Sequence, residues 1–299
     1  PSPGNPYFIG CIIMPYAQCY SYNLKELRKI AFQSSIWEGF PDCSGKAVFI
    51  KPNLVTPPNR FDCQSCTHVN LVRIASEMAL EGGADKVVIG ECGFKNQWQK
   101  TMEFCSYPDL LSLSPKIEII PLQDGPNFHK FSLVRLTKGE YLSLYGVKFS
   151  DYLLECDLVI NIPKLKMHSM AFITGAIKNM MGTMAQKGSM HPKADPSILH
   201  KRLRDFYLLI QPRIKFCLMD GIIGAEYCEQ YGVPVQSNLL ISETDCWKLD
   251  CMAASAMSVK PSEVPYLSLI KRFKREEWPE LIPLELRKPY ERPLGWRKD

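Results

Sequence analysis

The feature that most constrains this chain is an apolar run at residues 158–162 that ends at a proline and is followed at once by cations and imidazoles. Proline cannot donate to a central ladder, so Pro163 predicts the end of a buried strand. Thr174 and Gly175 then begin a predicted short helix that runs to Met181. Open α/β sheets bind ligands where strands end and helices begin. The stretch therefore predicts a binding site.

Seven polar side chains gather in this stretch. They are Lys164, Lys166, His168, Thr174, Lys178, Asn179 and His191. Gly175 lets a bound group approach the backbone, and the free N–H groups of a helix start suit an anion. Each residue alone is more simply explained as a solvated lysine or a structural histidine. Their density favours a ligand site instead.

A second strand ends in the same way. Residues 47–50 form an apolar run followed by Lys51, Pro52 and Asn53. We expect the two strand tips to meet at one edge of the sheet. The residues expected to converge there are Lys51, Asn53, Lys164, Lys166 and His168. A desolvated lysine near other cations has a lowered pKa, so one of these amines could act as a base or a nucleophile.

Strands and helices alternate along most of the 299 residues, which predicts an α/β fold with a largely parallel sheet flanked by helices. The expected strands cover residues 7–14, 47–50, 86–90, 116–122, 158–162, 215–219 and 238–242. The expected helices cover residues 24–37, 69–81, 97–105, 199–210 and 245–257. Thr67 and Asp245 are the predicted N-caps of two of these helices.

Two segments depart from this alternation. Residues 131–149 alternate apolar and polar side chains around a glycine, which predicts a β-hairpin insertion. From residue 271 the chain mixes charged residues, proline and tryptophan without periodicity. We therefore expect an α/β domain at residues 1–270, with a cleft near residues 150–195 that could separate two lobes, and an irregular C-terminal arm at residues 271–299.

Composition limits the classes of function. The formal charge of +5 permits anionic ligands but does not favour nucleic acid. The twelve cysteines are scattered, which is typical of thiols in a reducing compartment such as the cytoplasm. No run of eighteen apolar residues occurs, so no membrane span is expected. The first residues also lack the charged-then-apolar order of a signal peptide.

Metal binding is a further expectation. His168 and His191 could share a metal or act as an acid and a base, since imidazole titrates near neutral pH. Two histidines need carboxylates to complete such a site, and each of the candidates follows a predicted strand. These candidates are Asp220, Glu226 and Glu91. Separately, Cys63 and Cys66 form a C-x-x-C pair before a helix, an alternative metal or iron–sulfur site that lacks a second pair.

Three segments together resemble the domain of unknown function 362 family. They are residues 49–55, residues 159–168 with 174–182, and residues 219–224. The resemblance covers about residues 46–269. Some members of that family carry a ferredoxin-like cluster module, but this chain has no run of four closely spaced cysteines.

A more distant resemblance is to the nickel-pincer lactate racemase family. By order along the chain, it implies that Lys178 attaches the cofactor, His191 binds nickel and His168 transfers a proton. Ala176 and Ile177 stand where the racemase has paired glycines before its lysine. The cofactor implied is therefore a nickel-pincer-like nucleotide or another metal, with an iron–sulfur cluster as the alternative.

The sequence thus predicts an enzyme, racemase-, lyase- or transferase-like, that acts on a small anionic or phosphate-bearing ligand. The alternatives are a cysteine-based iron–sulfur or metal-binding redox protein and a ligand-binding module without catalysis. The expected catalytic residues are Lys178, His168, Lys166 and Asp220. The expected ligand-binding residues are Lys51, Asn53, Lys164, Thr174, Gly175 and Asn179. The substrate and the reaction stay open.

Overall fold

The computed structural model describes residues 14–55, 65–92, 98–122, 131–136, 142–185, 190–191, 195, 197–230 and 232–293. Most of the strand expected at residues 7–14 lies outside these ranges, as does Cys63.

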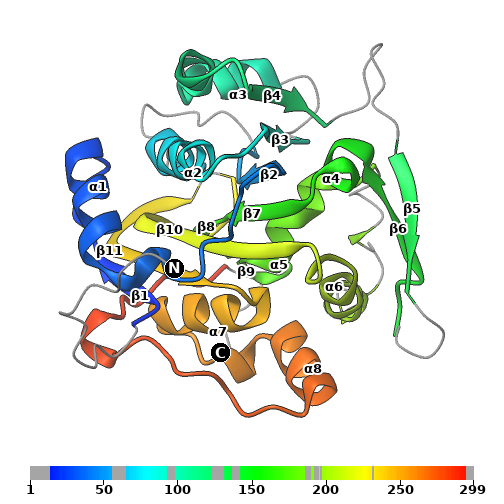
Figure 1. Cartoon of the computed structure of the whole chain (residues 1–299). Coiled ribbons are helices and arrows are strands. Elements are labelled where there is room, and N and C mark those ends of the chain that lie inside the picture. The colour runs from blue at the N-terminus through cyan, green and yellow to red at the C-terminus, as the bar shows by residue number, and fades with distance from the viewer. Residues whose placement is uncertain are drawn as a thin grey trace.

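The centre of the molecule is a largely parallel β-sheet (Figure 1). The strands are β1 (Tyr16–Gln18), β2 (Ala47–Pro52), β3 (Lys86–Glu91), β4 (Ile117–Pro121), β5 (Phe131–Arg135), β6 (Gly146–Ser150), β7 (Leu158–Ile162), β8 (Lys164–His168), β9 (Phe172–Thr174), β10 (Ile214–Glu226) and β11 (Val233–Glu243). Across the sheet the order is β1-β11-β10-β7-β2-β3-β4. From β10 to β4 all neighbours are parallel, whereas β11 is antiparallel to β10 and β1.

Helices cover both faces of this sheet, so the predicted α/β class is confirmed. The α-helices are α1 (Leu24–Gln33), α2 (Val69–Glu81), α3 (Trp98–Phe104), α4 (Asp151–Glu155), α5 (Ala176–Asn179), α6 (Ser197–Ile210), α7 (Cys246–Ala256) and α8 (Pro265–Lys274). Short 3-10 helices cover Ser35–Trp37, Tyr107–Leu113, Met180–Thr183, Pro261–Glu263 and Leu284–Leu286. One apolar core lies between the sheet and α1 to α3, and the other lies against α4 to α8.

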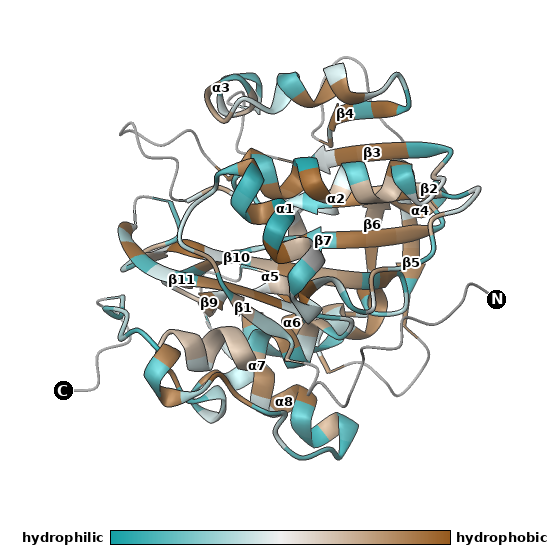
Figure 2. Ribbon diagram, turned by 60° about the vertical axis from the view of Figure 1, so that its left-hand side comes forward, coloured by the Kyte–Doolittle hydropathy of each residue, from teal (hydrophilic) through white to brown (hydrophobic). Residues whose placement is uncertain are grey.

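The central strands are apolar on both sides because both cores need them. In β2, Val48 and Ile50 pack into the core beneath α1 and α2, while Phe49 packs into the opposite core. In β7, Ile160 packs into the core beneath α1 and α2, and Val159 packs into the opposite core. Parallel strands covered on both faces have continuous apolar sequences of this kind (Figure 2).

The segment after Pro163 differs from the prediction. Instead of a loop that leads to a helix, it forms strand β8, which pairs in parallel with β10 and antiparallel with β9. Side chains of a strand alternate between its two faces, so Lys164 and Lys166 share one face with His168. The period-two cations resemble a solvent-facing edge in the sequence, yet every residue of β8 is buried.

Strand β10 is also longer than predicted. The predicted strand covered residues 215–219, whereas β10 runs from Ile214 through Glu226. Its glycines belong to close packing rather than to a turn, since a Cβ at Gly224 would collide with the Tyr290 hydroxyl. At Gly221 a Cβ would lie 2.7 Å from the carbonyl oxygen of Leu239 on β11.

The helix predictions hold with small changes. Helix α2 covers the expected residues, but its N-cap is His68, whose side chain accepts from Asn70 N, rather than Thr67. Asp245 caps α7 as predicted and accepts from Trp247 N at 2.8 Å. Helix α8 crosses the expected boundary at residue 271, so the irregular C-terminal segment begins after Lys274.

The predicted hairpin is present as the antiparallel pair β5 and β6. Behind it, the buried Asp205 of α6 accepts from the backbone N–H groups of Leu142, Ser143 and Leu144, with the shortest contacts at 2.6–2.8 Å. One carboxylate therefore ties the segment before β6 to the body of the molecule.

Replacing Asp205 with asparagine should lower the free energy of unfolding by at least about 2 kcal/mol, because charged acceptors contribute more than neutral ones and an amide donor would face backbone donors. Urea unfolding measures the loss, and faster hydrogen exchange at residues 142–144 locates it. The matched control is Asp195→Asn at an exposed helix start, which should cost clearly less. Equal losses in the two variants would contradict this role for Asp205.

Candidate functional site

A cavity of about 280 Å³ lies where β2, β3 and β8 end. Its wall is formed by Asn53, Val55, Glu91, Lys166, His168, Thr174, Lys178, Asn179, Met181, Gly182, His191, Glu229 and Gln230. Eight of the residues predicted from the sequence to bind a ligand, catalyse or help bind a metal lie in this wall. They are Asn53, Glu91, Lys166, His168, Thr174, Lys178, Asn179 and His191.

Lys166 is the most deeply buried cation of this wall. Its side chain is fully buried, and its Nζ donates to the carbonyl oxygens of Ser65 and Glu229, both at 2.9 Å. Desolvation lowers the pKa of Lys166 to about 8, although nearby acidic groups, chiefly the Cys66 thiol and Glu229, act in the opposite direction. The amine is therefore charged at pH 7 but close to the range in which it can exchange a proton.

His168 is fixed in one tautomer. Its Nδ1 accepts from the backbone N–H groups of Met170 and Ala171 at 3.0 and 3.1 Å, so the ring proton must be on Nε2. Nε2 lies 3.7 Å from a carboxylate oxygen of Glu229. Burial, followed by the charge of Lys178, holds the pKa of His168 well below its usual range. His168 is therefore a neutral hydrogen-bond donor at pH 7.

Lys178 and His191 line the same cavity, as the sequence predicted. Lys178 lies on α5 and is partly buried, and His191 is partly buried as well. The rings of His168 and His191 are nearly parallel, with centroids 6.3 Å apart. Two imidazoles and two amines therefore surround one small space.

Hydrogen bonds link three buried side-chain amides next to this cavity, those of Asn53, Asn161 and Asn179, and we call this set the amide relay. Asn161 donates through Nδ2 to the carbonyl oxygen of Ala176 at 2.9 Å and accepts from Asn179 Nδ2 at 2.7 Å. Asn179 also donates to the carbonyl oxygen of Lys51 and accepts from Asn53 Nδ2 at 2.8 Å. The relay connects the ends of β2 and β7 to α5.

Two polar atoms of the cavity wall lack partners among the described residues. They are Asn53 Oδ1 and Thr174 Oγ1, both buried. Buried polar atoms are normally hydrogen-bonded because leaving one unpaired costs about 1–3 kcal/mol. Each therefore marks a place where a bound group would restore a hydrogen bond.

The helix start at Gly175 does not offer its donors to an external anion, which corrects that expectation. The buried carboxylate of Asp250 on α7 accepts from Ala176 N at 2.5 Å and from Ile177 N at 3.3 Å. Gly175 is required here, since a Cβ would collide with this carboxylate. Tyr266 also donates to Asp250, and burial raises the pKa of this carboxyl to about 7.

Lys51 lies behind the wall rather than in it. Its ammonium is fully buried and pairs with Glu91, which does line the cavity. Glu91 also accepts from the backbone N–H of Cys92 at 2.8 Å. Lys51 therefore neutralises a wall carboxylate and is held away from direct contact with a ligand.

Lys164 and Asp220 belong to a separate buried cluster, which corrects their expected roles in the shared site. Lys164 Nζ lies 2.9 Å from Asp220 and 2.9 Å from the hydroxyl of Tyr22. Asp220 also accepts from Tyr22 at 2.6 Å and from His68 N at 2.9 Å. Neither Lys164 nor Asp220 lines the cavity. Two residues along β8 span about 7 Å, so Lys164 falls outside the space that Lys166 reaches.

The structure adds little support for the alternative metal or iron–sulfur site at Cys63 and Cys66. Cys63 lies outside the described residues, and Cys66 is a buried free thiol. A hydrogen bond with Cys105 lowers the pKa of the Cys66 thiol, and the Lys166 charge acts in the same direction. Within the described ranges, no group of three His, Cys, Asp or Glu side chains is placed to hold a metal ion.

Sequence reasoning missed four residues that shape the site. Glu229 and Gln230 follow β10, whose predicted end lay too early to bring them near the cavity. Asn161 is the polar residue inside the apolar run of β7. A buried amide needs hydrogen-bond partners, so its position in the sequence could have predicted the amide relay. Asp250 had no such signal, because it is one acid within an ordinary helix.

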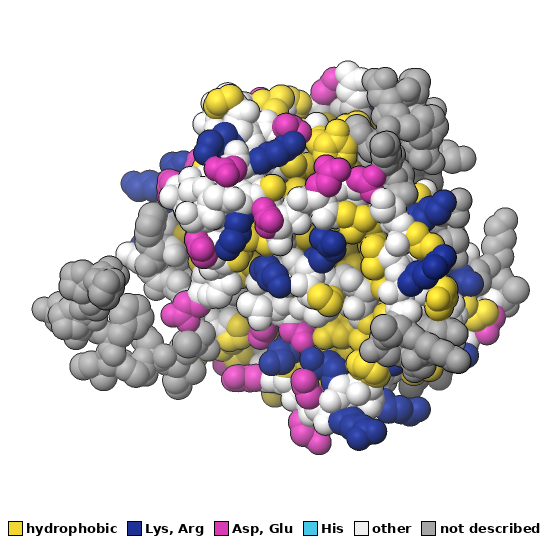
Figure 3. Space-filling model, turned by 45° about the vertical axis from the view of Figure 1, so that its right-hand side comes forward, with side chains coloured by type: hydrophobic (Ala, Val, Ile, Leu, Met, Phe, Trp, Pro, Cys, Tyr) yellow, Lys and Arg dark blue, Asp and Glu magenta, His cyan; other side chains and the backbone are white. Residues whose placement is uncertain are grey.

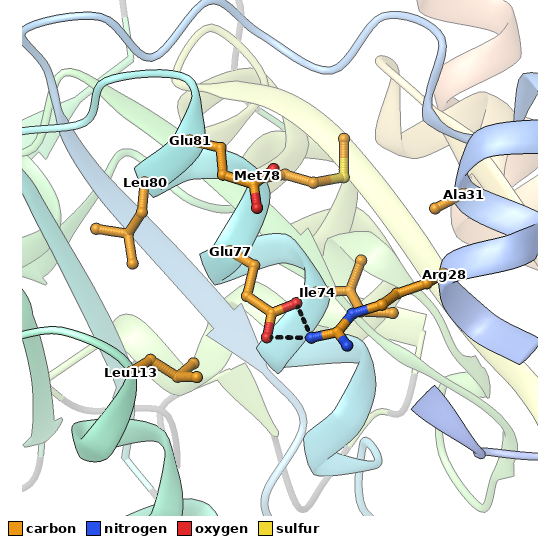
Figure 4. Close-up of a pocket in the computed structure, with 8 residues that line it drawn as sticks. All are labelled: Arg28, Ala31, Ile74, Glu77, Met78, Leu80, Glu81 and Leu113. Atoms are coloured by element: carbon orange, nitrogen blue, oxygen red, sulfur yellow. Dashed lines mark hydrogen bonds and ion pairs between the residues drawn. The ribbon is translucent and has the colours of Figure 1, made fainter. Parts of the chain in front are cut away.

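A larger hollow, of about 710 Å³, lies between α1 and α2 (Figure 4). Arg28 donates to both carboxylate oxygens of Glu77 across it, at 2.8 and 2.9 Å. Helix α2 leads away from the strand ends, so its last turns lie at the opposite edge of the sheet. The hollow is lined by one cation and by two acids, Glu77 and Glu81. It lies away from the strand ends, where open α/β sheets bind their ligands.

The surface charge is mixed on the face shown in Figure 3. Lysine and arginine side chains are interspersed there with aspartate and glutamate among the described residues. The positive charge of the chain is therefore not gathered into one basic patch on that face.

The chain matches the family described as "Domain of unknown function (DUF362)" over residues 48–255. It belongs to this family. A curated relative, the thylakoid-associated protein sll1697 of Synechocystis sp., is 25% identical over an alignment of 236 residues that covers 76% of this chain and 68% of the relative. The DUF362 match includes the three segments from which the resemblance was inferred.

Two solved structures resemble this DUF362 protein. The lactate racemase apoprotein from Thermoanaerobacterium thermosaccharolyticum has a TM-score of 0.48 and 11% identity, covering 81% of this chain and 56% of its own. A protein from Thermotoga maritima has a TM-score of 0.48 and 13% identity, covering 86% of this chain and 60% of its own. This chain thus spans little more than half the length of either. None of the helices in its described ranges is long and apolar enough to cross a bilayer.

Replacing Asp220 with asparagine should lower the free energy of unfolding by about 3–5 kcal/mol, because the buried Lys164 ammonium loses its carboxylate. The matched control is Glu118→Gln in the surface pair with Lys86, which should change stability by less than about 1 kcal/mol. Urea unfolding of both variants measures the difference. Similar values for the two would show that Lys164 is not held as a buried charge.

Proposed function

We propose that the strand-end cavity binds a small anionic ligand and that the protein is an enzyme that moves a proton on this ligand. The observation that carries the proposal is the Lys166 ammonium. It is fully buried, and its hydrogen bonds within the described residues go to neutral carbonyl groups. A buried charge without a bonded counterion is costly, and a bound anion offsets that cost.

The other wall groups fit this role. Lys178 adds a second positive charge, and the neutral Nε2–H of His168 is a directional donor that suits an anionic oxygen. With a pKa of about 8, the Lys166 amine can take up or release a proton near neutral pH. His191 is the second candidate for proton transfer, because it faces the same space and is less buried.

A metal-linked cofactor is a second candidate, favoured by one observation. Lys178, His168 and His191, which the resemblance to lactate racemase singles out, line one cavity. Lys178 would hold such a group covalently and His191 would bind its metal, which would supply a Lewis-acidic centre. The described residues do not provide three metal donors, so the group itself would have to complete the coordination. Metal analysis of the purified protein tests this candidate, and one equivalent of nickel lost in His191→Ala would support it.

We also propose a reducing compartment such as the cytoplasm. The ten cysteines within the described ranges are free thiols, nine of them buried. Thiols in this number persist where glutathione or thioredoxin keeps them reduced.

Replacing Lys178 with methionine should weaken the binding of sulfate about tenfold or more, because one charge-assisted hydrogen bond is lost. Lys178→Arg keeps the charge and should retain most of the binding while losing any reaction that needs a free amine. The control is Lys260→Met at an exposed position. Calorimetric titration measures the dissociation constants. Unchanged binding in Lys178→Met would remove Lys178 from the site.

The affinity for sulfate should also fall as the pH rises above about 8. The pKa of Lys166 is lowered, so its ammonium loses its proton in that range, whereas sulfate keeps its charge. Each pH unit above the pKa leaves about tenfold less ammonium to bind the anion. Titrations between pH 6.5 and 9.5 measure the inflection, which should be absent in Lys166→Met. A dissociation constant that stays constant over this range would contradict the role of Lys166.

A further inference from the structure

The polarity of the amide relay and the buried hydroxyl of Thr174 define one more property of the ligand. Resting on the function proposed above, we propose that the ligand carries a hydroxyl or amino group beside its anionic group, and that Asn53 and Thr174 select it. The chemical class is a small hydroxylated or aminated phosphate, sulfonate or carboxylate.

The relay fixes which way Asn53 is oriented. Its far end is anchored by the carbonyl oxygen of Ala176, which can only accept, so Asn161 must present its amide nitrogen there. The oxygen of Asn161 then faces Asn179, whose nitrogen also donates to the carbonyl oxygen of Lys51. The side-chain oxygen of Asn179 therefore faces Asn53, which must donate to it through Nδ2.

It follows that the remaining atom of Asn53 is an acceptor. Asn53 Oδ1 is buried and has no partner among the described residues, and Asn53 lines the cavity. An acceptor in this position repels an anionic oxygen and is satisfied by an N–H or O–H group of the ligand. Flipping the amide would break the hydrogen bond to Asn179, so the preference is built in.

Thr174 gives the second, independent observation. Its hydroxyl is buried without a partner within the described residues, and the residue lies in the same wall. A hydroxyl both donates and accepts, so it can bind the same ligand group or an adjacent oxygen. A purely structural wall would use valine here, which has the same shape and leaves nothing unpaired.

The donors of the cavity wall, in contrast, require an acceptor on the ligand. Lys166, Lys178 and the Nε2–H of His168 are donors, which attract negative or lone-pair-rich atoms. Donors and an orphan acceptor lining about 280 Å³ call for a ligand that is bifunctional over a few ångströms. A bare anion such as sulfate meets the first requirement and leaves the second unmet.

The test uses matched pairs of probes that differ by one polar group. They are 2-hydroxyethanesulfonate against ethanesulfonate, glycerol phosphate against propyl phosphate, and 2-aminoethyl phosphate against ethyl phosphate. Calorimetry on the full chain should give about tenfold tighter binding for the hydroxyl or amino member of at least one pair, the gain from pairing a buried polar atom. Thr174→Val should reduce that ratio at least threefold, and Thr174→Ser should restore it.

A stability measurement separates selection from folding. Because the Thr174 hydroxyl has no partner within the described part of the chain, Thr174→Val should leave the melting temperature of the ligand-free protein unchanged or raised. The control is Thr183→Val, whose hydroxyl donates to Met180 O at 2.7 Å and whose loss should lower the melting temperature.

The outcomes distinguish the two proposals. If no probe of any pair binds, and sulfate does not bind either, the anion site itself fails. If both members of every pair bind equally well, or the ratio is the same in Thr174→Val, the anion site stands and the selection of a donor-bearing ligand is overturned. A drop in melting temperature for Thr174→Val equal to that of Thr183→Val would show that the hydroxyl is structural, which also overturns it.

Discussion

The parallel pairing of β2 with β7 is the constraint on which the site depends. It sets Lys51 opposite Asn161, so the two strands end side by side and their polar tips share one space. Thr67 fastens the same junction by donating to the carbonyl oxygen of Ile162 and accepting from the backbone N–H of Asn53. Shifting this register by one residue would turn each side chain to the other face of the sheet and separate the amides.

Local sequence patterns predicted the parts of the fold that depend on local physics. The apolar runs of β2, β3 and β7 and the spacing of α2 are strong signals because both faces of the sheet are covered. The convergence of strand tips follows from parallel topology alone, so Asn53, Lys166 and His168 could be assigned to one place. Family membership rested on the same residues.

The rest depends on contacts between distant segments, which periodicity does not contain. Cations at every second position of β8 look solvated, and only pairing with β10 shows that they are buried. Lys164 pairs with Asp220, more than fifty residues later in the chain, whereas Lys166 lines the cavity. Asp250 lies more than seventy residues from the helix start that it caps.

The two backbone donors that hold His168 Nδ1 have an electrical consequence. A second proton on this ring would break both hydrogen bonds, so acid that charges ordinary histidines leaves this one uncharged. The neutral ring is a dipole whose direction is fixed by the two backbone N–H groups that bind Nδ1. A bound molecule would therefore meet the same donor on both sides of the pH at which an ordinary histidine titrates. This part of the wall would thus hold a molecule in one pose without sensing acidity.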